Sequence, residues 1–154
     1  MPTVVKRIAR AILLDDDAHL VLFKRDKPGR DIYWATIGGG VDAEDTSVEA
    51  ALHREVFEEL GGKIADAQQV FIVTDQRQSG IAIQHFFVAR LLSLDLDNRT
   101  GTEFDKPENG TYELVRVPLT PEGIAQIDLK PPQAAEFISA NTEGLLSLAT
   151  NPPD

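Results

Sequence analysis

Short apolar segments separated by polar turns make up most of the chain, and this pattern predicts several strands and a few helices. Near the start, three segments have the composition of strands, at 8–14, 20–24 and 33–37, after which Gly38-Gly39-Gly40 is expected to break the chain. Further strands are expected at 69–74, 81–91 and 111–117, and short helices at 121–127 and 132–140. Core candidates in the two middle strands are Val70, Ile72, Ile81, Ile83, Phe86 and Phe87.

The clearest helix signals lie between the glycines and the middle strands. Thr46 can cap the helix, with Glu49 three residues later as its capping-box partner, and Gly61 can stop it in a left-handed conformation. We therefore expect a helix over 47–60. Four apolar residues spaced four apart form a stripe that can pack on a sheet: Val48, Leu52, Val56 and Leu60.

The predicted strands and helices interleave along the chain, which indicates an α/β or α+β fold. The chain has 154 residues, and neither a break in composition nor an internal repeat divides it. We expect a single domain over residues 1–150 and a frayed tail over 151–154.

The composition excludes several classes of chemistry. The chain has no cysteine, so thiol catalysis, thiolate zinc sites and disulfides are ruled out, and a reducing compartment is favoured. The first residues lack the apolar core of a signal peptide, and no apolar run is long enough to span a membrane. We therefore expect a cytoplasmic protein.

The charge is strongly acidic. Fifteen Lys and Arg against 25 Asp and Glu give a formal net charge of −10, which argues against nonspecific binding to nucleic acid or to an anionic membrane. An anionic small molecule is still compatible with this charge, because a bound divalent cation can reverse the local field.

Three of the acids form one stripe on the predicted helix. Glu55, Glu58 and Glu59 are spaced i, i+3 and i+4, so they share a face about 100° wide beside the apolar stripe. Like charges in this arrangement destabilise a helix by a few tenths of a kcal/mol per pair. A metal ion at the edge of the buried face would offset that cost, whereas the alternative is a solvated acidic face.

The glycines and the acidic stripe together resemble the Nudix box. The segment from Gly38-Gly39-Gly40 through Arg54-Glu55-Val56-Phe57-Glu58-Glu59-Leu60-Gly61 is similar to its Arg-Glu-aliphatic-any-Glu-Glu-any-Gly core and preceding glycine. The loop is one or two residues longer than in the box, so that either Asp45 or Glu44 stands in for the acid that orients Arg54. The closing aliphatic position is Gly62.

The resemblance implies a Nudix-type α/β/α sandwich, with a mixed sheet between helices, and a metal-dependent hydrolase. Its substrate would be a nucleoside diphosphate linked to another moiety, cleaved at the phosphoanhydride bond. By position, Glu55, Glu58 and Glu59 would hold Mg²⁺ or Mn²⁺, with Glu55 as ligand, general base or both, and Arg54 would position them. A later acid often joins the ligands in this family, and Glu103 is preferred to Glu108 because Phe104 can anchor its loop.

The substrate contacts are less defined by sequence. The glycines Gly38, Gly39 and Gly40 would approach the substrate, and the basic residues Lys24, Arg25, Lys27 and Arg30 would contact its phosphates or form a solvated hairpin edge. No nucleic acid or membrane partner is expected, and a homodimer is left open. The alternative function is a Nudix-like module that binds a nucleotide without cleaving it.

Overall fold

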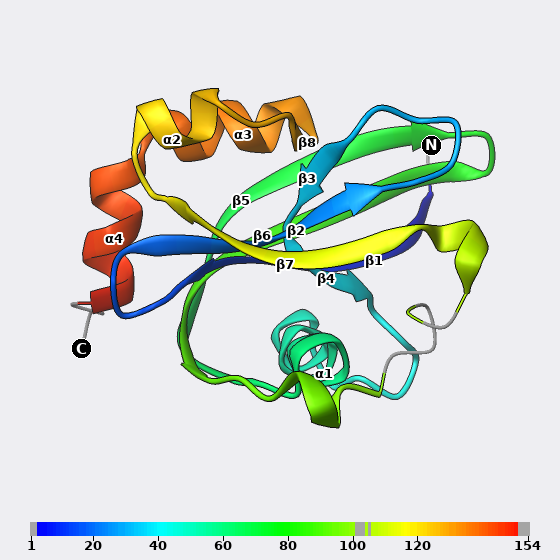
Figure 1. The fold of residues 1–154 in the computed structure, drawn as a ribbon. Helices are drawn as coiled ribbons and strands as arrows, with labels where there is room; N and C mark the ends of the chain where they lie inside the picture. The colour runs from blue at the N-terminus through cyan, green and yellow to red at the C-terminus, as the bar shows by residue number, and fades with distance from the viewer. Residues whose placement is uncertain (1–2, 101–103, 105, 151–154) are drawn as a thin grey trace.

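A computed structural model describes residues 3–100, 104 and 106–150 of the chain. It shows a mixed α+β fold, as the sequence predicted, in which a strongly curled sheet lies between helices (Figure 1). The strands are β1 (Val4–Leu14), β2 (His19–Asp26), β3 (Tyr33–Ala35), β4 (Ile37–Gly40), β5 (Lys63–Arg77), β6 (Gly80–Ser93), β7 (Thr111–Pro118) and β8 (Leu129–Lys130). The helices are α1 (Val48–Leu60), α2 (Pro121–Ala125), α3 (Pro132–Ala140) and α4 (Thr142–Thr150), with short 3-10 turns at Leu96–Asn98 and Pro107–Asn109.

Strand β1 lies at the centre of the sheet. The strand order is β5-β6-β1-β2-β3-β8, with β4 also paired to β1 and β7 to β2. The pairing of β1 with β6 is parallel, whereas β1 pairs antiparallel with β2 and β4. Because β1 is covered on both faces, its apolar residues run together from Ala11 to Leu14 instead of alternating with polar ones.

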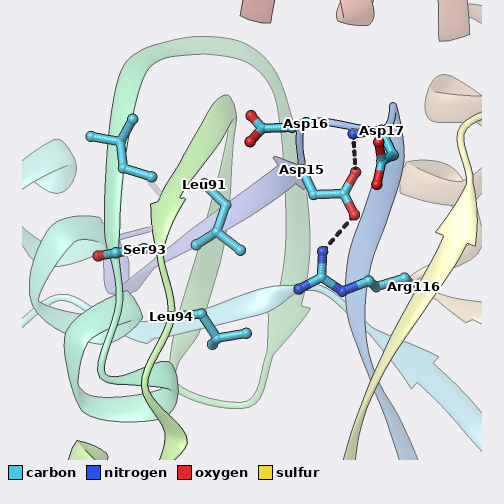
Figure 2. Close-up of a pocket in the computed structure, with 8 residues that line it drawn as sticks. Asp15, Asp16, Asp17, Leu91, Ser93, Leu94 and Arg116 are labelled. Carbon is cyan, nitrogen blue, oxygen red and sulfur yellow. Dashed lines mark hydrogen bonds and ion pairs between the residues drawn. The ribbon is translucent and has the colours of Figure 1, made fainter.

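The turn between β1 and β2 is fixed by one aspartate. Asp15 accepts hydrogen bonds from the backbone N–H groups of Asp17 and His19, both at 2.9 Å, and pairs with Arg116 of β7 at 2.6 Å (Figure 2). Burial alone would raise the pKa of the Asp15 carboxyl, but these bonds outweigh it and the pKa is lowered. The turn is thereby tied to the edge formed by β7.

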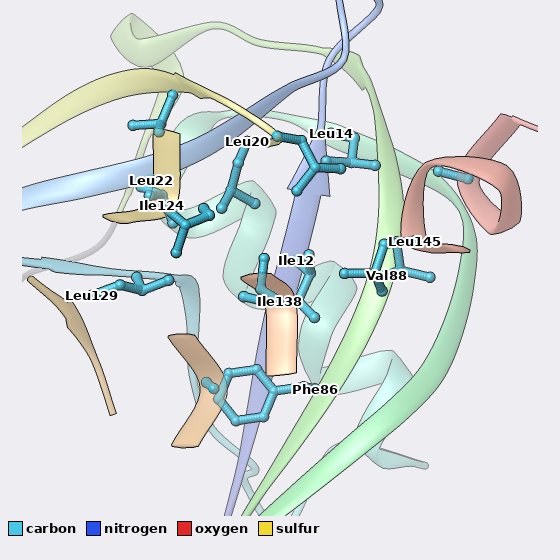
Figure 3. Packing of buried hydrophobic residues seen from close by; sticks show 14 of the residues in the cluster. Ile12, Leu14, Leu20, Leu22, Phe86, Val88, Ile124, Leu129, Ile138 and Leu145 are labelled. Carbon is cyan, nitrogen blue, oxygen red and sulfur yellow. The ribbon is translucent and has the colours of Figure 1, made fainter. Parts of the chain in front are cut away.

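Two apolar clusters hold the helices to the sheet. On one side, residues of α3 and α4 pack on β1, β2 and β6 through Ile12, Leu22, Phe86, Ile138 and Leu145 (Figure 3). On the other side, α1 packs on the same strands. Its predicted apolar stripe is confirmed, since Leu52, Val56 and Leu60 are fully buried and Val48 packs at the margin.

The glycine segment differs from the expectation of a chain break. Strand 33–37 is split at Thr36, and the glycines continue as β4, paired antiparallel with β1 so that Gly39 faces Ala9 and Gly38 faces Arg10. Gly38 has φ of 147°, and a Cβ there would overlap the carbonyl oxygen of Ala9. Only glycine allows the backbone to pass this close.

The middle strands also depart from the prediction. Val70 packs at the margin of the core, but Ile72 is 49% exposed, and Val73 is buried in its place. Strand β5 has register irregularities before this point, and each added residue turns the following side chains to the opposite face. Phe86 and Phe87 are buried as predicted, and α4 was not predicted.

Within the described part of the chain, no helix has the length and apolar character needed to cross a membrane.

Candidate active site

Helix α1 presents the acidic stripe, and both of its ends are fixed locally. The N-cap is Ser47, whose side chain accepts from the N–H of Ala50 at 3.0 Å, so the prediction of Thr46 as cap with Glu49 as partner is wrong by one residue. The C-terminal stop is confirmed: Gly61 is left-handed, with φ of 60°, and its N–H donates to the carbonyl of Phe57 at 2.8 Å.

Arg54 joins the helix to the loop that precedes it. Its guanidinium donates two hydrogen bonds to Asp45, at 3.0 and 2.9 Å, and a third to the carbonyl of Gly40 at 2.9 Å. Of the two acids left open by the sequence, the structure therefore places Asp45 on Arg54, whereas Glu44 is exposed. The bond from Arg54 lowers the pKa of the Asp45 carboxyl, and Asp45 in turn raises the pKa of Arg54.

The same guanidinium also contacts the acidic stripe. One nitrogen of Arg54 lies 3.1 Å from a carboxylate oxygen of Glu55 and 3.1 Å from one of Glu58. Part of the like-charge repulsion predicted for the stripe is therefore offset within the helix itself. Arg54 fixes both the loop and the two acids, which suits a positioning role.

Two of the glutamates pack against the glycine strand. Glu59 is 5% exposed and accepts from the N–H of Gly38 at 2.9 Å. Glu55 is 9% exposed, and a Cβ added to Gly39 would lie 2.6 Å from its carboxylate atoms. The absence of side chains at Gly38 and Gly39 therefore leaves the space in which the two carboxylates approach the backbone.

The three glutamates match a hard divalent cation by donor type, because they offer carboxylate oxygens, and two of them are buried one helical turn apart. Among the described residues, however, no group of three or more such side chains is arranged to hold a metal ion. The predicted ligand Glu103 lies outside the described residues. Its alternative, Glu108, is exposed, and the ring centre of Phe104 lies 4.8 Å from that of Tyr112.

A cleft opens beside these residues and has two lobes that share Arg10, Arg25, Ala35 and Thr36. The smaller lobe, of about 210 Å³, is lined by Glu59 and Gly38, and we call it the glutamate lobe. The larger lobe, of about 540 Å³, is lined by basic residues from five separate segments, and we call it the basic lobe. The two lobes together form a site large enough for a small-molecule ligand.

The predicted basic cluster is divided by the structure. Arg25 and Arg30 line the basic lobe, whereas Lys24 lies 5.8 Å from the ring centre of Trp34, and the half-buried Lys27 lines neither lobe. Sequence reasoning missed the other basic residues of this lobe, which are Arg10, Arg77 and Lys130. They come from β1, β5 and β8, far apart along the chain, so no local pattern in the sequence could have found them.

Comparison with known proteins gives a match to one family model, described as the NUDIX domain, over residues 5–138. No curated protein matches the chain.

Solved structures with similar folds include a NUDIX hydrolase from Nitrosomonas europaea, at a TM-score of 0.69 and 17% identity over 90% of this chain and 89% of that one. Another is a MutT NUDIX hydrolase from Burkholderia pseudomallei, at a TM-score of 0.59 and 21% identity over 88% of this chain and 95% of that one. A UDP-X diphosphatase is similar at 0.64 and 18% identity, over 94% of this chain and 64% of that chain.

Proposed function

The chain belongs to the Nudix hydrolase family, and from this premise we propose that it hydrolyses the phosphoanhydride bond of a nucleoside diphosphate linked to another moiety. The observation that carries the proposal is the packing of Glu55 and Glu59 against the glycine strand, with Arg54 held in place by Asp45. Glu59 lines the glutamate lobe of the cleft together with the cationic side chains of Arg10 and Arg25. We further propose that the substrate is a small molecule and that the protein acts in the cytoplasm.

In the proposed reaction, a water oxygen forms a bond to one phosphorus atom while the bridging P–O bond breaks. The proton leaves the water for a carboxylate, and the leaving phosphate takes the electron pair of the broken bond. The products are two phosphate-bearing molecules, or one together with pyrophosphate. We propose Glu55 as the group that accepts the proton, because its buried carboxylate lies against Gly39, next to Gly38 of the glutamate lobe, and Arg54 fixes one of its oxygens.

We propose that Glu55, Glu58 and Glu59 hold Mg²⁺ or Mn²⁺, with Glu103 as a further ligand. A cation bound there would neutralise charge on the diphosphate and lower the pKa of the attacking water. The role of Arg54 is to set the positions of Glu55 and Glu58 relative to β4, since it binds both carboxylates and the carbonyl of Gly40.

One observation is also compatible with a second function, nucleotide binding without cleavage. Glu58 is held by Arg54, and the described residues contain no group of three ligating side chains. A protein that binds a nucleotide through the cleft without cleaving it would show the same features. This second candidate is a non-catalytic nucleotide-binding module.

A screen of nucleoside diphosphate derivatives separates the two functions. The protein is incubated with each derivative and Mg²⁺ or Mn²⁺, and release of phosphomonoester is followed, with Glu59→Gln purified in parallel to exclude a contaminating hydrolase. Turnover of at least one derivative by the wild type and its loss in Glu59→Gln support the proposal. Saturable binding of a derivative without any turnover supports the binding module.

A further inference from the structure

The basic lobe contrasts with the overall charge of the protein. Five cationic side chains line it, and none of the described lining residues is acidic: Arg10, Arg25, Arg30, Arg77 and Lys130. The chain as a whole carries 25 acids against 15 Lys and Arg. Arg77 pairs with Asp75 at 3.4 Å and Lys130 with Asp128 at 3.2 Å, so part of this charge is balanced from outside the lobe. The lobe itself still gathers positive charge in an acidic protein, which favours an anionic ligand there.

Three of these arginines form no ion pair with a described residue: Arg10, Arg25 and Arg30. Arg25 donates to the backbone carbonyls of Thr111 and Asn109. Arg10 donates to Gln84 at 3.4 Å and to the carbonyls of Thr36 and Gly38 at 3.4 and 3.3 Å, which are long for hydrogen bonds. In a chain with so many acids, arginines bound only to neutral oxygens keep their charge available to a ligand.

The half-buried Arg10 lies between acidic and basic groups. Burial lowers the pKa of its guanidinium, although Glu59 and Glu55 across the glutamate lobe raise it, and repulsion from Arg25 lowers it further. Arg10 and Arg25 are shared by both lobes, so this repulsion acts where the two lobes meet.

Aromatic rings hold two of the guanidinium groups in place. The Cζ atom of Arg25 lies 3.5 Å from the ring centre of Tyr112, and that of Arg30 lies 4.7 Å from the ring centre of Tyr33. Stacking on a ring fixes the plane of a guanidinium. One edge of Arg25 is used by the carbonyls of Thr111 and Asn109, whereas Arg30 can present its N–H edge to an oxyanion through two parallel hydrogen bonds. Phosphate is the anion that such a fork matches best.

We propose that the basic lobe binds a phosphate group of the substrate that lies outside the scissile diphosphate. This inference rests on the proposed function, which places the scissile diphosphate beside Glu55 and Glu59. Arg30, Arg77 and Lys130 line only the larger lobe, so they are positioned for a second anionic group. The substrate class is thus a nucleoside diphosphate derivative with an additional phosphate, carried either as a monoester on the sugar or as an extension of the phosphate chain.

The test measures binding in excess chelator, where the metal-dependent reaction does not proceed. Dissociation constants are measured by calorimetry for AMP and for adenosine 2′,5′- and 3′,5′-bisphosphate, which contain no anhydride, and for ADP and ATP. Arg30→Gln and Arg77→Gln remove charge from the lobe, and circular dichroism checks their folding. Arg90→Gln is the matched control, because Arg90 pairs with Asp66 at 3.4 Å and lines neither lobe.

We expect one added phosphate to tighten binding by about tenfold or more, since charge-assisted hydrogen bonds contribute about that much. Arg30→Gln and Arg77→Gln should remove most of this gain, whereas Arg90→Gln should keep it. A gain of the bisphosphates over AMP identifies a sugar monoester, and a gain of ATP over ADP identifies a longer phosphate chain.

The proposal is overturned if no probe binds, if the added phosphate gives no gain, or if Arg90→Gln reduces the gain as much as Arg30→Gln. These outcomes are independent of turnover. A phosphate-dependent gain without hydrolysis of any diphosphate derivative would leave the phosphate site standing and refute the proposed reaction.

Discussion

Substitution of Gly39 by alanine tests the position of Glu55, the proposed proton acceptor, with little effect on the stability of the fold. A Cβ at this residue would lie 2.6 Å from the carboxylate atoms of Glu55, so the carboxylate must move by about 1 Å to reach ordinary contact. The backbone of Gly39 is not left-handed, and the obstructing atoms are the end of a flexible side chain. The backbone can therefore accept alanine.

A displacement of about 1 Å in a catalytic group lowers the rate by on the order of 100-fold. Replacing a strand glycine by alanine stabilises the protein by roughly 0.5–1 kcal/mol, which offsets part of the strain in moving Glu55. We therefore expect Gly39→Ala to reduce kcat by about 100-fold while the free energy of unfolding changes by about 1 kcal/mol or less. The measurements are turnover of the best derivative from the screen and urea unfolding.

The neighbouring glycines provide controls in the same strand. Gly40→Ala places its Cβ 3.5 Å from Lys6, an ordinary contact, so its effect on kcat should be at least tenfold smaller. Gly38→Ala collides with the backbone of Ala9 at a positive φ and should destabilise the fold by several kcal/mol. Equal loss of activity in Gly39→Ala and Gly40→Ala, or unfolding of Gly39→Ala, would refute the reasoning.

Two further predictions concern charged groups. Arg54→Ala should lose far more activity than stability, because a partly exposed ion pair contributes only about 0–1 kcal/mol to the free energy of unfolding. In double-mutant cycles measured by turnover, Asp45→Ala should couple with Arg54→Ala, whereas Glu44→Ala should be additive with it. The reverse result would reject Asp45 as the partner of Arg54. Burial, and to a smaller extent Arg7, lower the pKa of His85. The unfolded chain therefore takes up a proton on this histidine at a higher pH than the folded protein does. The free energy of unfolding should keep its full value above about pH 6.5 and fall below that pH. Urea unfolding between pH 7.5 and 5 should show a smaller fall in His85→Gln; the same fall in both proteins would contradict this origin.

The parts of the site that were predicted correctly depend on neighbours in sequence. The helix could be placed because its apolar stripe and its terminal Gly61 are local signals, and the structure confirms both. The N-cap was missed by one residue, since Thr46 and Ser47 both have the required hydroxyl. The spacing of the glutamates on the helix follows from its period alone.

The parts that were missed depend on tertiary contacts. The glycines pair as a strand because β1 offers a backbone partner, and glycine has no side chain by which a pattern could signal this. The choice of Asp45 over Glu44 depends on the path of the loop, in which the N–H of Asp42 also donates to Asp45. The exposed Ile72 follows from irregular pairing of β5 with β6.

The basic lobe illustrates the same limit. The sequence pattern identified only the cations that are adjacent in the chain, and two of those four line the cleft. The other three cations of the lobe, Arg10, Arg77 and Lys130, lie on strands whose order in the sheet differs from their order in sequence. Charge that is dispersed in sequence can therefore be concentrated in space, even in a chain with a net charge of −10.

The central claim is that the glutamates of α1 carry a metal-dependent hydrolysis. It is tested most directly by the rate of phosphomonoester release from the best derivative of the screen, measured against Mg²⁺ concentration for the wild type, Glu58→Gln and Glu59→Gln. The account predicts that wild-type turnover rises with Mg²⁺ and vanishes in excess chelator. Both variants should turn over slower by orders of magnitude, while Glu59→Gln keeps an oxygen for the N–H of Gly38 and remains folded. Wild-type turnover that persists in chelator, or variants as active as the wild type, would contradict it.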